Sequence, residues 1–421
     1  MSLKEEMMEL ARQSKQASRL LPRMSTDDKN ACLNAMADAI VENAAVIKEA
    51  NAKDMETGRG MGLSDAMLDR LLLSDERING MANGLCEVAD LPDPLGEILD
   101  ERKRPTGLML RKVSTPIGAI VIIYESRPNV TADAAGLCFK SGNSTILRGG
   151  KEALNSNQAI ACLMVEAGLN TSADFPEHAI QVVPTTERAA IPELLSQIDL
   201  IDLCIPRGGE GLIRAVAECS RVPVIKHYKG ICCVYIDGKA DFDMALEIVV
   251  NSKTHRPGVC NAMETLLVDE SIAPEFLQRA ARALSNKGVE LRADEGARTI
   301  LGDNCKPATA EDWDTEYLDL ICAVRVVGGL EEAIEHINEH GSGHTDVIVT
   351  DDEAAAARFQ NEVDSSTVFW NASTRFTDGG QFGMGAEIGI STDKIGARGP
   401  MGLAELTSYK WLGMGDGLIR E

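Results

Sequence analysis

The spacing of apolar residues divides the chain into a helical first part and a longer part in which strands and helices alternate. In residues 1–97, apolar positions recur at the three- to four-residue spacing of amphipathic helices. Ser25 supplies an N-cap for a periodic run that continues to Ala50. A segment with two prolines and a glycine, residues 90–96, ends this block. We therefore predict a set of helices, each with one buried face.

Residues 98–115 change to the two-residue alternation of a β-strand. Two short alternating runs flank Pro105-Thr106-Gly107, which is a turn sequence, so we predict a β-hairpin. An isolated hairpin is only marginally stable in water. We expect this one to rest on another element, and a second subunit is one candidate.

From Gly118 onward, short apolar runs alternate with helical patterns. The run 119–124 is continuously apolar, as expected for a strand buried on both faces, and strand–helix units follow up to residue 236. This predicts an α/β fold with an open parallel sheet of nucleotide-binding type. The same alternation over residues 263–370 predicts a second α/β domain. The tail is glycine-rich until a last helix or strand at 403–412.

Composition limits the kinds of protein that the chain can be. Its 421 residues are enough for two or three domains, and 44% of them are hydrophobic. No run of 18 apolar residues predicts a membrane span, and the acidic first residues do not resemble a signal peptide. The 11 cysteines are irregularly spaced, which is typical of a cytoplasmic protein with reduced thiols.

The charge balance argues against a nucleic-acid-binding protein. Acidic residues number 65 and basic residues 42, so the formal net charge is −23. Such a surface repels phosphate backbones, and aromatic residues, which could stack on bases, make up only 4% of the chain. An anionic ligand would need a locally basic pocket.

Cys260 is the strongest candidate for chemistry. It lies in a loop marked by proline and glycine, just before an apolar run at 266–268 that indicates a strand. Lys253, His255 and Arg256 precede it, and nearby positive charge favours the reactive thiolate. Such a nucleophile could attack an activated acyl group and form a thioester. Most cysteines are simply small buried residues, so the loop supports the nucleophile without deciding it.

Two junctions between a strand and a helix could hold phosphates, although neither G-x-G-x-x-G nor a Walker A sequence occurs. Arg148 and Lys151 flank a pair of glycines, and Gly208-Gly209 opens a helix whose free N–H groups favour anions. Each junction alone is equally compatible with an ordinary βα loop.

Other charged residues are candidates for binding, each with a simple alternative. Glu316 precedes an apolar strand and could bind ribose hydroxyls, or it could be a solvated carboxylate. An amino-acid-like substrate carries an ammonium and a carboxylate, and either could be bound by charged side chains that are equally consistent with surface ion pairs. These candidates are Glu125, Arg127, Arg256 and Arg375.

His336 and His340 match the H-x-x-E-H arrangement of one class of zinc peptidase. The helix that carries them stops at Gly341, and histidines in a last turn also suit the helix dipole. His344 is poorly placed as a third ligand. We therefore predict no metal site, and zinc stays an alternative.

Several long motifs, in matching order, closely resemble the aldehyde dehydrogenase superfamily, and in particular its branch that reduces glutamyl phosphate. The segments that carry the resemblance are 124–130, 146–153, 206–209, 256–265, 342–346 and 396–403. The resemblance implies an aldehyde-dehydrogenase-like α/β fold with three parts. These are an NADP(H)-binding domain (1–97 and 116–236), a catalytic domain with Cys260 (237–402) and a small β oligomerisation element (98–115 and 403–421).

The resemblance also implies a reaction, in which NADPH reduces L-glutamyl 5-phosphate to L-glutamate 5-semialdehyde and phosphate is released. This is the second step of proline synthesis from glutamate. Cys260 would form the thioester, and its backbone N–H together with Asn129 would hold the oxyanion. Arg148 and Lys151 would favour the 2′-phosphate of NADPH over the free hydroxyl of NADH. Glu316 would bind the nicotinamide ribose.

One segment departs from the hydrolytic members of the superfamily, which use a glutamate to activate water. Here the corresponding residues, 226–230, contain no carboxylate. A thioester that is exchanged with phosphate does not need that water, and the local cations could attract phosphate.

The remaining expectations concern partners and alternatives. A homo-oligomer in the cytoplasm is expected, and the labile substrate would come from a separate enzyme, glutamate 5-kinase, through a transient complex or by diffusion. The alternatives are a semialdehyde dehydrogenase with another substrate, a non-catalytic nucleotide-binding or scaffolding protein, and the zinc peptidase.

Overall fold

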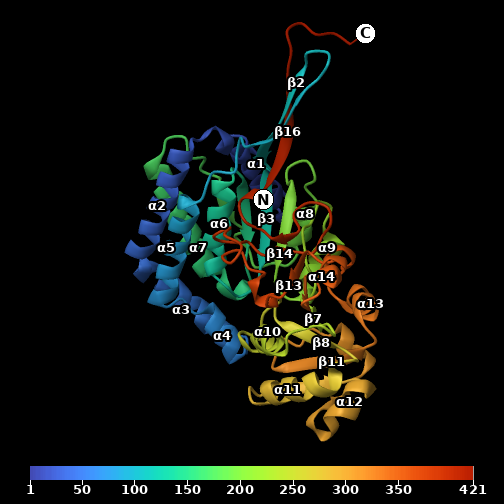
Figure 1. Ribbon diagram of the computed structural model, residues 1–421. Coiled ribbons are helices and arrows are strands. Elements are labelled where there is room, and N and C mark those ends of the chain that lie inside the picture. Colours follow the sequence, from blue (N-terminus) through green and yellow to red (C-terminus); the bar gives the residue numbers. More distant parts are fainter. Residues whose placement is uncertain (421) are drawn as a thin grey trace. The chain divides into compact units, whose positions relative to one another are not determined.

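The structure, a computed structural model, describes residues 1–420 and consists of two compact units (Figure 1). Unit 1 contains Met1–Lys226, Gly383–Gly389 and the chain from Met401 onward, and unit 2 contains His227–Phe382 and Ile390–Pro400. No helix within residues 1–420 has both the length and the apolar character needed to cross a membrane.

Unit 1 begins with the predicted helices, and serine side chains start most of them. Ser2, Ser25, Ser64 and Ser74 each accept a hydrogen bond from a backbone N–H of the first turn. The helices are α1 (Leu3–Ser18), α2 (Thr26–Glu42), α3 (Ala44–Gly60), α4 (Asp65–Leu71) and α5 (Asp75–Asp90).

The periodic run that was predicted to continue to Ala50 is broken at Asn43, between α2 and α3. The amide Nδ2 of Asn43 donates to the carbonyl of Ala39 at 2.9 Å. An asparagine side chain that bonds to nearby backbone in this way competes with the helix, which explains the break.

The sheet of unit 1 has four parallel strands in the order β5-β4-β3-β6. They are β3 (Ala119–Tyr124), β4 (Ser144–Arg148), β5 (Ile180–Val182) and β6 (Leu203–Arg207). The helices that connect and cover them are α6 (Asn129–Lys140), α7 (Leu154–Thr171), α8 (Ala190–Leu195) and α9 (Glu210–Cys219). All six residues of β3 are buried, as predicted. Because β3 lies between β4 and β6, the strand order reverses here, and ligands of such sheets bind at the carboxyl ends beside the reversal.

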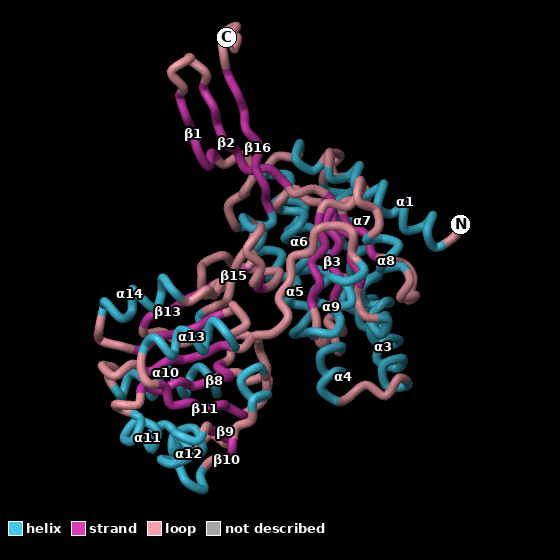
Figure 2. Tube along the Cα trace, turned by 90° about the vertical axis from the view of Figure 1, so that its right-hand side faces the viewer, coloured by secondary structure: helices cyan, strands magenta, loops and turns pink. Residues whose placement is uncertain are grey.

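The predicted hairpin is formed by β1 (Ile98–Lys103) and β2 (Met109–Pro116). The last element, which the sequence left as helix or strand, is β16 (Thr407–Met414), and it pairs antiparallel with β2. Figures 1 and 2 show this three-stranded sheet standing away from the helices of its own unit. Its two outer strands, β1 and β16, are largely exposed, including Ile98, Tyr409 and Trp411, whereas β2 between them is partly buried.

Unit 2 is built on a parallel sheet of seven strands in the order β10-β9-β11-β8-β7-β12-β13. The strands are β7 (Cys232–Ile236), β8 (Met263–Asp269), β9 (Glu290–Ala293), β10 (Lys306–Pro307), β11 (Ile321–Val327), β12 (Thr345–Val349) and β13 (Thr367–Trp370). The helices are α10 (Phe242–Thr254), α11 (Ala273–Ser285), α12 (Glu295–Leu301), α13 (Leu330–His340) and α14 (Glu353–Glu362).

Helices cover both faces of this sheet, and alternate side chains of β7 pack into the core on one face or the other. Val234 and Ile236 belong to the core that contains residues of α10 and α11, whereas Cys233 and Tyr235 belong to the core that contains residues of α13 and α14. The two-residue period of a strand therefore divides a continuously apolar segment between two cores.

The predicted domain boundary differs from the structure. The sequence places residues up to 236 in the cofactor domain, but β7 pairs with β8 and β12 in the second sheet, and unit 2 begins at His227. Residues 383–389 and 401–402, predicted to be catalytic, belong to unit 1. A buried strand shows the same apolar run in either sheet, so its pattern could not assign it. The pattern of apolar residues also does not predict β9, α12 or β10, because elements this short show no clear period.

Candidate active site

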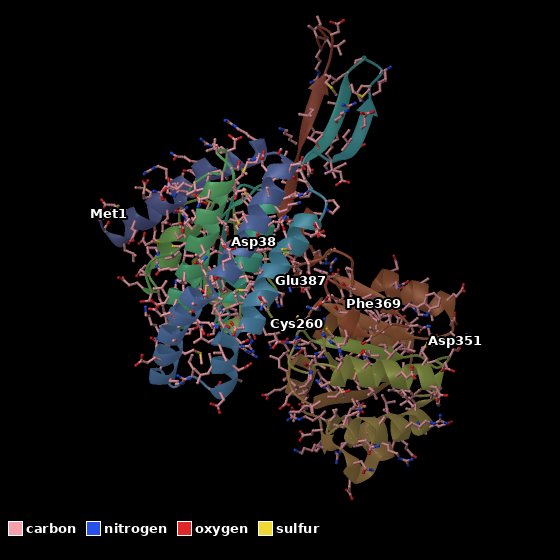
Figure 3. All side chains as sticks on the ribbon, turned by 90° about the vertical axis from the view of Figure 1, so that its left-hand side faces the viewer. Met1, Asp38, Cys260, Asp351, Phe369 and Glu387 are labelled. Atoms are coloured by element: carbon pink, nitrogen blue, oxygen red, sulfur yellow. The ribbon has the colours of Figure 1, made fainter. Side chains whose placement is uncertain are left out.

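Cys260 lies in the loop between α10 and β8, where it is labelled in Figure 3 and is partly buried. The neighbouring backbone is closely packed. A Cβ atom on Gly230 would lie 2.0 Å from the carbonyl oxygen of Cys260 and 2.5 Å from its Cα, so only glycine fits there. The thiol of Cys232 donates to the same carbonyl oxygen at 3.2 Å. These contacts fix the backbone that presents the thiol.

A buried ion pair ties the two flanks of this loop together. Lys253, near the end of α10, and Glu264, in β8, are both 0% exposed, and Nζ lies 2.6 Å from Oε2. The other carboxylate oxygen of Glu264 accepts from the Leu318 N–H at 3.3 Å. Burial raises the pKa of Glu264 to about 7, although the Lys253 ammonium favours the charged carboxylate. The pair closes the loop at its base.

Arg375 and Arg256 lie in the electrostatic environment of Cys260. Burial, together with the positive charge of Arg256, lowers the pKa of Arg375, while the negative charges of Asp378 and the Cys260 thiolate act in the opposite direction. Arg375 Nε donates to His255 Nδ1 at 3.4 Å. The structure thus brings together three of the predicted site residues, Cys260, Arg256 and Arg375.

Glu316 joins the same site through Gly230. Its Oε1 accepts from the Gly230 N–H at 2.9 Å. Since Gly230 packs on the backbone of Cys260, this carboxylate supports the segment behind the nucleophile. Glu316 therefore lies close to Cys260 and has a structural role there, and its contact with the nicotinamide ribose stays a prediction.

Glu125, Gly208 and Gly209 lie together in unit 1, but their arrangement differs from the predicted one. Glu125 follows β3, and its Oε2 accepts from the Gly209 N–H at 3.0 Å, at the N-terminus of α9. The Gly209 N–H, which the sequence suggests as a donor to phosphate, thus donates to the Glu125 carboxylate instead. This contact argues against Gly208-Gly209 as a phosphate site and against Glu125 as a partner of the substrate ammonium.

Arg148 and Lys151, predicted to act together, have different environments. Arg148 is only 8% exposed, and its guanidinium donates to the carbonyls of Gly149 and Thr186, the latter at 3.2 Å. Burial lowers its pKa. Lys151, in a short turn after β4, is exposed. Arg148 therefore holds the neighbouring loop in place, and Lys151 is the cation that a ligand can reach.

Asn129 is the first residue of α6, and one of its amide N–H groups is engaged. Nδ2 donates to Asp133 Oδ2 at 3.0 Å, and burial raises the pKa of Asp133 to about 6. Only the second N–H of Asn129 could serve an oxyanion. Arg127, the remaining predicted residue, is exposed after β3.

The two histidines of the zinc alternative have other partners. His336 Nδ1 lies 2.9 Å from Arg325 Nη1, and His340 Nδ1 lies 3.0 Å from Asp314 Oδ1. Residues 1–420 contain no group of three His, Cys, Asp or Glu side chains arranged to hold a metal ion. The arrangement of α13 therefore gives no support to a zinc peptidase.

Two residues that position this site carry little signal that the sequence alone would reveal. Asn261, directly after the cysteine, donates to the carbonyl of Thr377 at 2.8 Å. Ser252, on α10, accepts from the Thr374 N–H at 3.3 Å. Both contacts join segments more than 100 residues apart in the chain. Only the place of Asn261 next to Cys260 could have signalled its importance.

Comparisons with known proteins agree with this architecture. Residues 2–302 match the Aldehyde dehydrogenase family. The chain is 53% identical to the gamma-glutamyl phosphate reductase of Geobacter metallireducens over 421 residues, which is 100% of both chains. The crystal structure of the Thermotoga maritima gamma-glutamyl phosphate reductase is similar with a TM-score of 0.96 and 45% identity, covering 99% of this chain and 100% of that one. The Saccharomyces cerevisiae gamma-glutamyl phosphate reductase gives 0.55 and 32%, covering 99% and 98%.

The chain therefore belongs to the aldehyde dehydrogenase family, as its motifs predict. Within that family its full-length identity groups it with the gamma-glutamyl phosphate reductases. The predicted fold class is confirmed as well.

Proteins of this family bind a nicotinamide cofactor, and the end of β4 fits one. Cβ atoms on Gly149 and Gly150 would lie 2.0 Å from Asn157 Nδ2 and 1.9 Å from Glu152 Oε1, so side chains of the protein pack directly against this backbone. The exposed Lys151, at the carboxyl end of a parallel strand, suits the phosphorylated ribose of a dinucleotide.

Proposed function

We propose that this protein catalyses the NADPH-dependent reduction of L-glutamyl 5-phosphate to L-glutamate 5-semialdehyde, with release of phosphate, as the second step of proline synthesis from glutamate. The observation that carries the proposal is the group of Cys260, Arg256 and Arg375 in one unit. It occurs in a chain that matches a named reductase over its full length.

In the proposed mechanism, the Cys260 thiolate attacks the acyl carbon of glutamyl phosphate. The bond from sulfur to carbon forms, the bond from carbon to the phosphate oxygen breaks, and a thioester remains on Cys260. The Arg375 guanidinium interacts favourably with the charge of the Cys260 thiolate, as expected for a cation beside a nucleophilic thiol. The Cys260 N–H and the second N–H of Asn129 are the proposed donors to the oxyanion. Bound NADPH supplies the hydride that reduces the thioester.

The surroundings of Cys260 support phosphate exchange over hydrolysis. The segment 226–230 carries no carboxylate, and Gly230 brings it against the backbone of Cys260. The two nearby glutamates, Glu264 and Glu316, accept hydrogen bonds from Lys253 and Gly230. Each carboxylate has a structural partner, which disfavours its use as a base for water.

The reaction is best tested in reverse, because the aldehyde is more stable than the acyl phosphate. With glutamate semialdehyde and NADP⁺, we expect NADPH absorbance to rise continuously only when inorganic phosphate is present. A continuous rise without phosphate would mean that water resolves the thioester, which would support a hydrolytic semialdehyde dehydrogenase instead. No NADPH formation under either condition would contradict the proposed substrate and favour a non-catalytic role.

Lys151 is the proposed reader of the 2′-phosphate of NADPH. We expect Lys151→Ala to lower kcat/KM for NADPH about 10- to 100-fold and to change the value for NADH less than about twofold, because a charge-assisted hydrogen bond contributes roughly 1.5–3 kcal/mol. The affinity for NADP⁺, measured by calorimetry, should fall in parallel. Lys53→Ala, which changes an exposed lysine on α3, is the control. An equal loss for both coenzymes would contradict this role.

Two further proposals concern assembly and location. The exposed sheet of β1, β2 and β16, with Ile98 and Trp411 on its strands, suits the contact of a homo-oligomer. All 11 cysteines are free thiols, which favours the reducing cytoplasm. There, glutamate 5-kinase would supply the acyl phosphate, either by diffusion or in a transient complex.

A further inference from the structure

Arg375 and Arg256 lie near Cys260, and neither forms an ion pair with a carboxylate among residues 1–420. We propose that Arg375 and Arg256 bind the phosphate that is transferred, and not the α-carboxylate of the amino acid. This inference rests on the proposed reductase activity and assigns one group of its substrate to named side chains.

The turn that carries Arg375 (Thr374–Phe376) is attached to the Cys260 loop on both sides. On one side, Ser252 of α10 bonds to Ser373 Oγ at 3.0 Å and accepts from the Thr374 N–H at 3.3 Å. On the other side, Asn261 Nδ2 donates to the Thr377 carbonyl at 2.8 Å. Because one of these contacts comes from the residue next to Cys260, Arg375 has a determined place beside the nucleophile.

The side chains in this turn leave positive charge unbalanced. Arg375 Nε donates to His255 Nδ1 at 3.4 Å, and this partner carries no negative charge. Within residues 1–420, neither Arg375 nor Arg256 forms an ion pair with a carboxylate, although Asp378 is close enough to raise the pKa of Arg375. Two like charges held together without a carboxylate partner are stabilised by an anion.

The chemistry of the substrate decides which anion this is. In glutamyl 5-phosphate, the phosphate is attached to the acyl carbon that Cys260 attacks, whereas the α-carboxylate lies at the far end of the carbon chain. Arg375 interacts with the charge of the Cys260 thiolate, and Arg256 acts on Arg375, so this pair is expected near the reacting carbon and hence near the phosphate. A phosphate dianion also matches two guanidinium groups, each of which can donate two parallel hydrogen bonds.

Bound there, the phosphate takes part in both directions of the exchange. In reduction, the bond between the acyl carbon and the phosphate oxygen breaks, and phosphate leaves with the electron pair and gains a proton from water. In the reverse direction, a phosphate oxygen attacks the thioester carbon, the carbon–sulfur bond breaks, and Cys260 leaves as the thiolate. The arginines balance the charge that passes between sulfur and phosphate.

The test separates the two substrate groups with Arg375→Gln in the reverse reaction. We expect the KM for phosphate to rise about 10- to 100-fold and the KM for glutamate semialdehyde to change less than about threefold. The burst of NADPH from the first turnover, in which the thioester forms before phosphate reacts, should keep the amplitude of the wild-type protein. Arg375→Lys should recover part of the phosphate affinity. Arg279→Gln, which changes an exposed arginine paired with Glu275 on α11, is the matched control.

A second measurement needs neither cofactor nor turnover. Inorganic phosphate should slow the alkylation of Cys260 by iodoacetamide in the wild-type protein and in Arg279→Gln, but not in Arg375→Gln. In Arg256→Gln, phosphate should also fail to protect Cys260 from alkylation. Because Arg256 is exposed, this variant can replace Arg375→Gln in the test if Arg375→Gln folds poorly.

The outcomes are distinct. A higher KM for the aldehyde with an unchanged KM for phosphate would overturn the proposal, because the arginines would then bind the carboxylate. Absence of phosphate protection in the wild-type protein would overturn it too. If the wild-type protein forms no NADPH from the aldehyde, the proposed reductase activity fails, and the alkylation experiment still decides whether phosphate binds beside Cys260.

Discussion

Cys260→Ala is expected to abolish NADPH formation from glutamate semialdehyde, with a loss of at least about 10⁴-fold in kcat, as expected when a covalent nucleophile is removed. The structure gives the reason. Cys260 is the cysteine whose loop is held by Gly230, by the Lys253–Glu264 pair and by the turn of Arg375. The measurement is NADPH absorbance with saturating phosphate and semialdehyde.

The control for this prediction is Cys162→Ala, because Cys162 is the exposed cysteine on α7 and lies in unit 1. Its removal should leave kcat within about twofold of the wild-type value. Mass spectrometry of the wild-type protein after reaction with the semialdehyde and NADP⁺, without phosphate, should show an acyl group on Cys260. An active Cys260→Ala variant, or an acyl group on another cysteine, would contradict the proposed mechanism.

Lys253→Met is expected to lower the free energy of unfolding by about 3–5 kcal/mol, the usual cost of leaving one member of a buried ion pair alone. Both side chains of the pair are 0% exposed, and burial already raises the pKa of Glu264 to about 7. Without the ammonium, the carboxylate can stay buried only if it takes up a proton. Urea denaturation at pH 8, followed by circular dichroism, measures the loss.

Lys239→Met is the matched control, because Lys239 pairs with Asp352 at 2.6 Å but is 70% exposed. Its removal should lower the free energy of unfolding far less than Lys253→Met does, because water screens the exposed pair. The double variant Lys253→Met with Glu264→Gln should regain part of the stability, since no buried charge then remains. A loss below about 1 kcal/mol for Lys253→Met would mean that Glu264 is neutral or hydrated in the folded protein. Activity should fall as well, because the pair closes the base of the Cys260 loop.

Individual residues show which features of the fold and the site can be predicted from the sequence. Most strands of both sheets, the hairpin and the Ser25 cap follow from local patterns of apolar and polar residues, and the structure has them. The nucleophile could also be named, because proline, glycine and cations around Cys260 are close in the chain. By contrast, Glu125 was assigned to the substrate, and the fold commits it to Gly209, 84 residues away.

The sequence by itself determined the family and the α/β fold and gave Cys260 as the candidate nucleophile, since each depends on residues within one short segment or on long motifs in order. Only the tertiary structure decided that β7 belongs to the second sheet, that Arg148 is buried while Lys151 is exposed, and that Arg375 lies beside Cys260. The physical reason is the same each time. Burial and electrostatic neighbours arise from segments that meet only in the folded chain, and the pattern around a residue does not record which distant segment will cover it.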